Sequence, residues 1–358
     1  DSVAARGRGD VYKRQLFYRV PSSLYHTLCR APIVAEKTIR IGLIGFGSWA
    51  RKAYVPALSS DQDIEIVAVA ARTNQTHIAA REILGPELQS YTDYNGLLER
   101  DDIDAVMIGM PSDSGADMTK ATINAGKHVF FEPPLEDSQT TEKLLEEGTT
   151  SDRVLHADLE LRYLPCMRTL KKIADLQDFG IVRFIHVSLE NDWAHHWDLD
   201  EAGLTSMVTG LSTWYIDPID LLVGHAAQTV QIVGTEHQVG HAQLNFKDGV
   251  EGQWQFNLRS ANEFSIKMKV VGEYGEIQAD LLSGEYHWNI GSSSNSGTDS
   301  CLQPVLGFVG MQESVRAFLA AIRGEKPTQS GPGVYSRIHN TVKALGKSQT
   351  SNMETTVE

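Results

Sequence analysis

The chain carries a short run of small residues whose spacing is suited to binding phosphate, Gly45-Phe46-Gly47-Ser48-Trp49-Ala50. Gly45, Gly47 and Ala50 occupy the three small positions of the pattern G-x-G-x-x-[G/A]. The first glycine permits a tight turn, the second lets the backbone approach a pyrophosphate, and the third position lets a helix pack closely on a strand. A helix that begins here directs free N–H groups at the phosphates. The run predicts a dinucleotide-binding turn, the alternative being a purely structural strand-to-helix turn.

The end of the next apolar segment, residues 64–70, distinguishes two cofactors. An acidic residue at this point would bind the adenosine ribose hydroxyls of NAD. The sequence instead has Arg72 and Thr73 there, without a neighbouring Asp or Glu. A guanidinium can pair with a 2′-phosphate, and a hydroxyl adds a further donor. We therefore predict NADP, with NAD as the alternative if Arg72 only faces solvent.

The elements that position these residues alternate regularly at first and then change in character. Alternating strands and helices over residues 38–155 predict an α/β Rossmann domain with a parallel sheet. Residues 156–358 are rich in strands and predict an α+β domain with a mostly antiparallel open sheet. The strands are expected at 39–44, 64–70, 105–109, 128–131, 154–161, 181–189, 229–233, 242–246, 253–258, 265–271 and 276–279. Helices are expected at 53–58, 75–84, 116–125, 136–149, 166–178 and 311–322, and a loop at 291–298.

Composition limits the classes of partner. The 358 residues have a formal net charge of −14, which disfavours nucleic acid and anionic membrane surfaces. The three cysteines are far apart in sequence and contain no C-x-x-C pair, which fits a cytoplasmic protein without disulfides. We see no apolar run long enough to span a membrane. Residues 1–37 are expected to be a non-native or disordered leader, because residues 1–15 lack apolar periodicity and no methionine precedes Met107.

From Thr38 onward the sequence resembles the glucose–fructose oxidoreductase/inositol dehydrogenase (Gfo/Idh/MocA) family. Besides the glycine turn, the resemblance rests on segments that match family motifs along the chain. These segments are 91–94, 104–111, 125–132, 270–277 and 317–324. The resemblance implies NAD(P)-dependent oxidation or reduction of sugars, cyclitols and related compounds. It also implies that Met110, Pro111 and Glu132 lie beside the cofactor.

The resemblance also implies an active site, and this chain departs from it. Family members use the lysine of a Glu-Lys-Pro motif together with an aspartate and a histidine on a helix of the second domain. Here the lysine position is Pro133, and alignment on Asp220 places the aspartate at Thr213 and the histidine at Asp217. The lysine and histidine would polarise the alcohol and move its proton, so another group must supply that chemistry if catalysis is retained.

Asp217 is one candidate for the missing proton donor. Burial would raise its pKa toward neutrality and allow acid–base work. Because Pro218 follows it, Asp217 equally fits a helix N-cap with proline at the first helical position.

A polar and aromatic segment after the expected strand 181–189 provides other candidates. Its His195 and His196 could exchange protons, and Trp193 could stack on a sugar ring. The alternative is an ordinary surface loop. Adjacent residues on a strand face opposite ways, so we do not expect the histidine pair to bind a metal.

The remaining candidates lie at the entrance to the second domain and on its predicted helix. Glu160 and Arg162 end the strand that enters this domain, where Arg162 could bind a carboxylate or phosphate of the substrate. The alternative for Arg162 is an ion pair between the domains. Trp214 and Tyr215 are predicted to contact substrate.

These observations predict an NAD(P)-dependent oxidoreductase that acts on a sugar-like or other small carbonyl or alcohol substrate. The alternative is a catalytically silent sensor or regulatory protein that binds NADP or a sugar. The open sheet of the second domain would need a cover, so we also expect a homodimer or homotetramer formed through that sheet.

Overall fold

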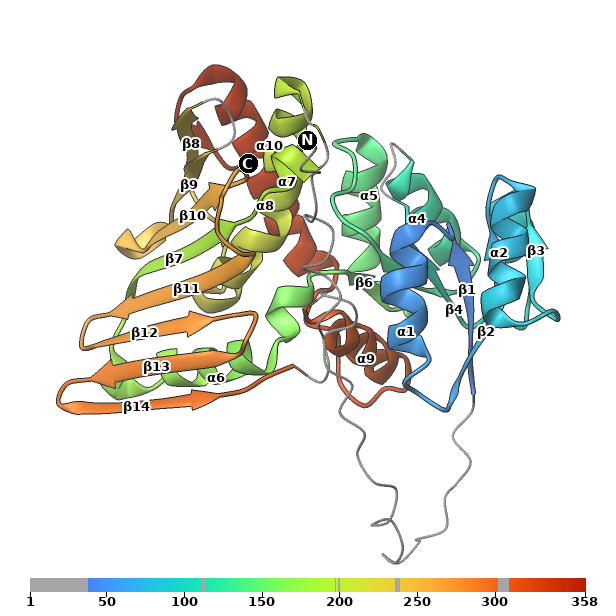
Figure 1. The fold of residues 1–358 in the computed structure, drawn as a ribbon, viewed down its shortest axis with the longest axis horizontal. Coiled ribbons are helices and arrows are strands. Elements are labelled where there is room, and N and C mark those ends of the chain that lie inside the picture. Colours follow the sequence, from blue (N-terminus) through green and yellow to red (C-terminus); the bar gives the residue numbers. More distant parts are fainter. Residues whose placement is uncertain (1–37, 111–113, 197, 199, 236–238, 302–308) are drawn as a thin grey trace, which may run out of the picture. The chain divides into compact units, whose positions relative to one another are not determined.

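The computed structural model describes residues 38–110, 114–196, 198, 200–235, 239–301 and 309–358. The range Thr38–Glu358 forms one compact unit built around two sheets (Figure 1). Within the described ranges, every helix is either too short or too polar to cross a bilayer. Cys166 and Cys301 are free thiols.

The first sheet has six parallel strands in the order β3-β2-β1-β4-β5-β6. This is the strand order of a Rossmann fold, and it confirms the predicted α/β class. The strands are β1 (Ile39–Ile44), β2 (Ile64–Ala70), β3 (Gln89–Tyr91), β4 (Ala105–Ile108), β5 (His128–Phe131) and β6 (Leu155–Ala157). Every residue of β4 is buried, as expected for a strand that helices cover on both faces.

Short helices connect these strands. They are the π-helix η2 (Ala50–Tyr54), α1 (Val55–Leu58), α2 (Asn74–Leu84), α3 (Tyr94–Leu98), α4 (Gly115–Asn124) and α5 (Gln139–Gly148). A later helix, α9 (Met311–Ile322), also packs on this part of the chain through Met311, Val315, Phe318 and Leu319, which share one core cluster with β1. The predicted helix 311–322 therefore has the predicted bounds, and its apolar face covers the parallel sheet.

The second sheet has nine strands in the order β14-β13-β12-β11-β7-β10-β9-β8-β15. All neighbours are antiparallel except β7 and β10, so the predicted mostly antiparallel sheet is confirmed. The strands are β7 (Val182–Glu190), β8 (Thr229–Thr235), β9 (Val239–Asn245), β10 (Glu251–Asn257), β11 (Ser265–Gly272), β12 (Gly275–Asp280), β13 (Glu285–Ile290), β14 (Ser293–Thr298) and β15 (Thr355–Thr356).

Two long helices cover one face of this sheet (Figure 1). Helix α8 (Glu201–Val223) packs on β7 and β10, and α10 (Pro332–Ser351) packs on β8. Helix α6 (Pro165–Ala174) contacts β12. Alternation along β7 shows the two faces, because Ile185, Val187 and Leu189 are buried in the core while His186 and Ser188 are only partly buried. The domain boundary expected at residues 155/156 stays a prediction.

The structure corrects several local expectations. Residues 291–298 were expected to form a loop, but Ser293–Thr298 is strand β14, paired with β13 through the backbone although its side chains are small and polar. The strand expected over 154–161 ends at Ala157, because the chain turns into the 3₁₀ helix η3 (Glu160–Tyr163). The N-cap interpretation of Asp217 is also wrong. Pro218 lies inside the 23-residue helix α8, whose actual N-cap is Asp200.

Candidate functional site

The glycine turn lies between β1 and η2, at the carboxyl edge of the parallel sheet. Gly45 has φ +85°, and a Cβ there would lie 2.4 Å from Met110 Cγ. Gly45 is therefore required by the fold itself. A Cβ at Gly47 would meet no described atom within 4 Å. The absence of a side chain at Gly47 thus leaves open space beside the backbone, which is what a closely approaching phosphate needs.

A cleft of about 570 Å³ begins at this turn. It is bounded by the ends of β1, β2 and β4 and by the start of α2. Its lining includes Gly45, Phe46, Gly47, Ala71, Arg72, Thr73, Tyr94 and Met110. The cleft therefore brings together six residues that the sequence predicted for cofactor binding: Gly45, Phe46, Gly47, Arg72, Thr73 and Met110.

Arg72 and Thr73 lie at the start of α2. Thr73 is the N-cap of this helix, and its Oγ1 accepts a hydrogen bond from the N–H of Thr76 at 3.2 Å. Arg72 is exposed and lines the cleft, and no hydrogen bond or ion pair joins its side chain to another described residue. A cationic side chain and the N-terminus of an 11-residue helix thus meet at one end of the cleft, an arrangement that favours an anion.

The residues of the turn and cleft fit a dinucleotide. Open space beside the Gly47 backbone fits a pyrophosphate, and the exposed Arg72 at the far end fits the adenosine half. Ser48 is exposed at the turn, and Ala50 is buried against the sheet, as the pattern requires. When bound, a nicotinamide dinucleotide would supply hydride acceptance or donation. Pro111, the other residue expected beside it, lies outside the described residues.

Trp49 connects the glycine turn to a buried acid. Its indole Nε1–H donates to Glu132 Oε2 at 2.9 Å, and the Tyr54 hydroxyl donates to the same oxygen at 2.6 Å. Tyr54 OH also lies 3.2 Å from the carbonyl oxygen of Ile108, the last residue of β4. Glu132 directly follows β5. These contacts place its carboxyl group at the carboxyl ends of β4 and β5, beside the turn that begins the cleft.

Two further carboxyl groups lie near Glu132 and with it form what we call the carboxyl cluster: Glu132, Asp158 and Glu160. Asp158 follows β6 and is fully buried, and Glu160 begins η3. Burial, and then the proximity of Asp158, raises the pKa of Glu132. Burial followed by the other two carboxyls raises the pKa of Glu160 well above its ordinary value, and burial raises the pKa of Asp158 to about 7. Three such groups cannot all ionise at neutral pH.

A chain of hydrogen bonds extends from Asp158 toward the surface. Ser314 Oγ donates to Asp158 Oδ1 at 2.9 Å, and His156 Nε2 lies 3.1 Å from Ser314 Oγ. His156 Nδ1 lies 2.8 Å from Thr328 Oγ1, which is half-buried. Because Ser314 donates to the carboxyl, His156 must donate from Nε2 and accept at Nδ1. Burial lowers the pKa of His156 to about 3, so the imidazole in this chain is neutral.

Arg162 has its own partners. Its Nε donates to Asp217 Oδ1 at 2.9 Å, Nη2 also pairs with Asp217, and Nη1 donates to the carbonyl oxygen of Gln329 at 2.7 Å. Asp220, which Arg337 also binds at 2.9 Å, lies 3.4 Å from Arg162 Nη2. Burial raises the pKa of Asp217 to about 6, although Arg162 acts in the opposite direction. Arg162 and Asp217 thus form a buried ion pair that joins η3 to α8.

Helix α8 brings aromatic groups toward the carboxyl cluster. The Trp214 indole N–H donates to the Asp158 carbonyl oxygen at 3.0 Å. Tyr215 is buried and stacks on Trp254 with centroids 5.7 Å apart. Burial, and then the charge of Glu160, raises the pKa of the Tyr215 hydroxyl. Thr213, at the position of the family aspartate, is buried with its Oγ1 unpaired among the described residues.

The segment with the histidine pair does not join these groups. Residues Trp193–His196 form the short helix α7 where a loop was expected, and the Ala194 N–H donates to the carbonyl oxygen of Leu258. The His195 side chain is 84% exposed and contacts Asp192 at 3.3 Å, and Trp193 packs on Phe264 with centroids 5.7 Å apart. The side chain of His196 lies outside the described part of the structure.

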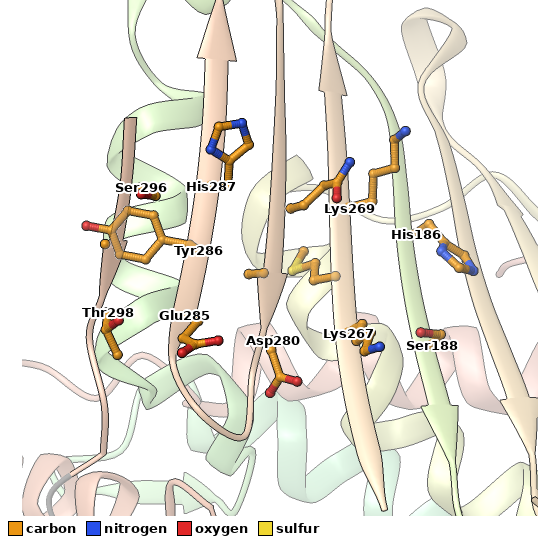
Figure 2. Close-up of a pocket in the computed structure, with 14 residues that line it drawn as sticks. His186, Ser188, Lys267, Lys269, Asp280, Glu285, Tyr286, His287, Ser296 and Thr298 are labelled. Atoms are coloured by element: carbon orange, nitrogen blue, oxygen red, sulfur yellow. The ribbon is translucent and has the colours of Figure 1, made fainter. Parts of the chain in front are cut away.

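A second cavity of about 730 Å³ lies on the face of the nine-stranded sheet opposite α8 (Figure 2). Side chains from five neighbouring strands line it, among them Lys267, Lys269, Asp280 and Glu285. It mixes positive and negative groups. Sequence reasoning predicted that this face needs a cover but identified none of these residues.

Sequence reasoning also missed Tyr54, His156, Asp158 and Ser314. His156 and Asp158 carried a usable signal, because they are polar residues that alternate with the apolar Leu155, Ala157 and Leu159 at the end of a strand. The others gave none, since their roles depend on partners that are distant in sequence.

Fold and site together define a dinucleotide-binding protein with a Rossmann sheet and a second, open sheet. The family model described as "Oxidoreductase family, NAD-binding Rossmann fold" matches residues 39–158. The 4-carboxy-2-hydroxymuconate-6-semialdehyde dehydrogenase of Sphingobium sp. (strain NBRC 103272 / SYK-6) is 36% identical over 330 residues, covering 86% of this chain and 97% of the relative. The chain belongs to the Gfo/Idh/MocA family of NAD(P)-binding oxidoreductases.

Other relatives match more narrowly. The dTDP-3,4-didehydro-2,6-dideoxy-alpha-D-glucose 3-reductase of Streptomyces violaceoruber is 30% identical over 175 residues, 47% of this chain and 51% of the relative. The match thus spans about half the length of that protein. Among solved structures, scyllo-inositol dehydrogenase from Lactobacillus casei, with bound NAD(H) and scyllo-inositol, gives a TM-score of 0.75 at 18% identity. It covers 90% of this chain and 99% of its own, which supports the fold.

Proposed function

We propose that this protein is an NADP-dependent oxidoreductase that transfers hydride to or from a small substrate bearing a CH–OH or carbonyl group. The observation that carries the cofactor preference is Arg72, which is exposed in the cleft beside the N-terminus of α2 and has no carboxylate neighbour there. A 2′-phosphate at this point would gain charge-assisted hydrogen bonds that the 2′-hydroxyl of NAD lacks. Gly45, Phe46, Gly47, Ser48, Trp49, Ala50, Thr73, Met110, Pro111 and Glu132 complete the proposed cofactor site.

The proposed substrate is sugar-like. Relatives named for a didehydro-dideoxyglucose, an inositol and a muconate semialdehyde share a small polar skeleton with a carbonyl or hydroxyl carbon. An aldehyde can also be oxidised by hydride loss once hydration or ring closure has converted it to CH–OH. Glu160, Trp214 and Tyr215 are the substrate-side residues we propose, because they meet near the carboxyl cluster. Arg162 and Asp217 would position this region through their ion pair, and the exposed His195 and the half-buried Trp193 are weaker candidates.

We further propose that two copies pair through the polar face of the nine-stranded sheet. The cavity in Figure 2 carries both Lys and Asp or Glu side chains, so a second copy could offer complementary charges. Sedimentation analysis that finds only monomer would contradict this. A cytoplasmic setting, expected from the cysteine pattern, stays a prediction.

The test of the cofactor assignment is a fluorescence titration of the purified protein with NADPH and NADH, repeated with Arg72→Ala. We expect NADPH to bind more tightly than NADH. We expect the variant to lose roughly ten- to hundredfold in NADPH affinity, since hydrogen bonds to charged groups contribute about 1.5–3 kcal/mol. NADH affinity should change little, which makes it the internal control.

The outcomes separate the candidate functions. Binding of neither cofactor would refute the assignment. Equal loss for both cofactors would refute the role of Arg72. A protein that binds the cofactor can then be tested for turnover with scyllo-inositol and NADP⁺, and with simple sugar aldehydes and NADPH. Cofactor binding without any change in NADPH absorbance in either mixture would favour the alternative of a silent sensor.

A further inference from the structure

The carboxyl cluster has a feature that the fold alone does not require. Asp158 is fully buried, yet its Oδ2 has no hydrogen-bond partner among the described residues, and the same holds for Glu160 Oε2. A buried acceptor without a donor is costly, and such atoms in a folded protein need an explanation. Thr213 Oγ1 and Asp217 Oδ2, both on α8, are unpaired in the same way. Of these atoms, the carboxyl oxygens of Asp158 and Glu160 lie within one cluster, because the charge of Asp158 acts on Glu160.

The surroundings of the cluster supply little compensating charge. No salt bridge joins Glu132, Asp158 or Glu160 to a Lys or Arg within the described residues. The nearby cation, Arg162, is engaged by Asp217 and Asp220. The other titratable groups that face the cluster are Tyr54 from η2, Tyr215 from α8 and the neutral His156 from β6. The described chain also holds no group of three His, Cys, Asp or Glu side chains arranged to bind one metal ion.

The position of the cluster relates it to the cofactor. Glu132 is bonded to Trp49 of the glycine turn and to Tyr54, whose hydroxyl also contacts the end of β4. The carboxyl ends of β4, β5 and β6 lie on the edge of the sheet where ligands of such folds bind. The Arg72 end of the cleft fits the adenosine half. Glu132, bonded to Trp49 of the glycine turn at the other end, therefore lies on the side left for the nicotinamide half.

We propose that Glu132, Asp158 and Glu160 form the acid–base centre of this protein, which holds a proton beside an uncharged nicotinamide ring and releases it when the ring is oxidised and cationic. This inference rests on the proposed function and assigns the group that performs the work of the missing lysine and histidine. Pro133, Thr213 and Asp217 occupy the family's catalytic positions, and none of them combines access with a free proton-carrying group. Glu160, half-buried with one shielded oxygen, is the member that reaches toward substrate.

The reaction balances when the cluster exchanges the proton and the proposed dinucleotide exchanges the hydride. In the oxidative direction the substrate C–H bond breaks and its hydride goes to the cofactor, while the substrate O–H proton passes to an ionised carboxylate of the cluster. The substrate thus loses one hydride, which carries both electrons, and one proton, and a carbonyl forms. In the reductive direction the protonated carboxyl returns the proton to the developing alkoxide. The chain Asp158–Ser314–His156–Thr328 fixes the orientation of Asp158 and keeps its Oδ2 directed away from Ser314.

The proposal predicts a difference between the two redox forms of the cofactor. A cationic ring near the cluster favours ionised carboxylates, so NADP⁺ binding should release more protons than NADPH binding. By linkage, NADP⁺ affinity should rise by up to about tenfold per pH unit between about pH 6 and pH 8. The 2′-phosphate is common to both forms, so its own titration affects both affinities equally.

The experiment is isothermal titration of the full chain with NADP⁺ and with NADPH, across this pH range and in two buffers of different ionisation enthalpy. Asp158→Asn and Glu160→Gln should each reduce proton release per NADP⁺ bound. Glu147→Gln, a matched change at an exposed carboxylate paired with Lys120, should leave it unchanged. Circular dichroism checks that each variant is folded.

The outcomes are separate from those of the proposed function. If neither redox form binds, the proposed function fails and this inference fails with it. If both bind with the same pH dependence and the same proton count, the acid–base centre is refuted while the cofactor assignment stands. The comparison of NADP⁺ with NADPH uses the wild-type protein alone, so it tests the acid–base centre even if a variant does not fold.

Discussion

The glycine turn and the carboxyl cluster lie at the same edge of the parallel sheet, but they are built differently. The turn is contiguous in sequence, open to solvent at Gly47, and adjacent to one end of the cleft that contains Arg72. The cluster is buried, acidic and assembled from the ends of β5 and β6 and from η3, with its hydrogen bonds supplied by η2 and α9. Binding chemistry here comes from a local motif, whereas proton chemistry comes from residues that only folding brings together.

A third group makes the contrast sharper. Asp217 is as buried as Asp158, but a guanidinium neutralises it, while Asp158 has only the Ser314 hydroxyl. Burial alone therefore does not distinguish a structural carboxylate from a functional one. The hydrogen-bonding partner distinguishes them. A carboxylate paired with a guanidinium is stabilised in its ionised form, whereas a buried carboxyl without a cation takes up and releases a proton more readily.

The largest expected effect comes from breaking the structural pair. Arg162→Met leaves Asp217 without its cation, and loss of one partner of a buried pair typically costs about 3–5 kcal/mol of unfolding free energy. Urea unfolding followed by circular dichroism measures this. Arg40→Met, at an exposed pair with Asp102, is the matched control and should cost at most about 1 kcal/mol. Equal losses of unfolding free energy in the two variants would show that the buried pair of Arg162 stabilises the fold no more than an exposed pair does.

The next effect is pH dependence of stability from the cluster. The pKa of Asp158 is about 7 in the folded protein and near its ordinary value of about 3.9 when unfolded, so the folded state binds more protons between these values. The stabilisation is fully present below the unfolded pKa and is lost as pH rises through the folded pKa. In the wild type, this carboxyl should make the free energy of unfolding fall by up to about 1.4 kcal/mol per pH unit between about pH 5 and pH 7. We expect Asp158→Asn to abolish this fall. Urea midpoints of wild type and variant across this range measure it, and parallel curves would contradict the shifted pKa.

The smallest effect distinguishes two positions within the glycine turn. Gly45→Ala imposes a left-handed conformation on alanine and a clash with Met110, so we expect a loss of about 2 kcal/mol in stability. Gly47→Ala meets only open space, so its stability should change by less than about 0.5 kcal/mol while NADPH affinity falls about tenfold or more. Thermal unfolding and fluorescence titration of both variants measure the two effects. Unchanged NADPH affinity in Gly47→Ala would contradict the proposed phosphate contact.

The sequence by itself determined the features that depend on neighbouring residues. The glycine turn, the strands of the parallel sheet, the change to a second sheet and the helix Met311–Ile322 all follow from short-range patterns of small and apolar residues. It missed β14, because Ser293–Thr298 has little apolar character and pairs only through its backbone. It misjudged Asp217 because a local Asp-Pro signal was outweighed by the packing of a long helix.

Only the tertiary structure decided which polar groups are paired. Arg162 and Asp217 are 55 residues apart, and Ser314 and Asp158 are 156 apart, so no local pattern relates them. The same separation hid the carboxyl cluster, whose members look like ordinary acidic residues until burial removes their water. Their proton affinity is set by burial and by distance to one another, and both arise only once the chain has folded.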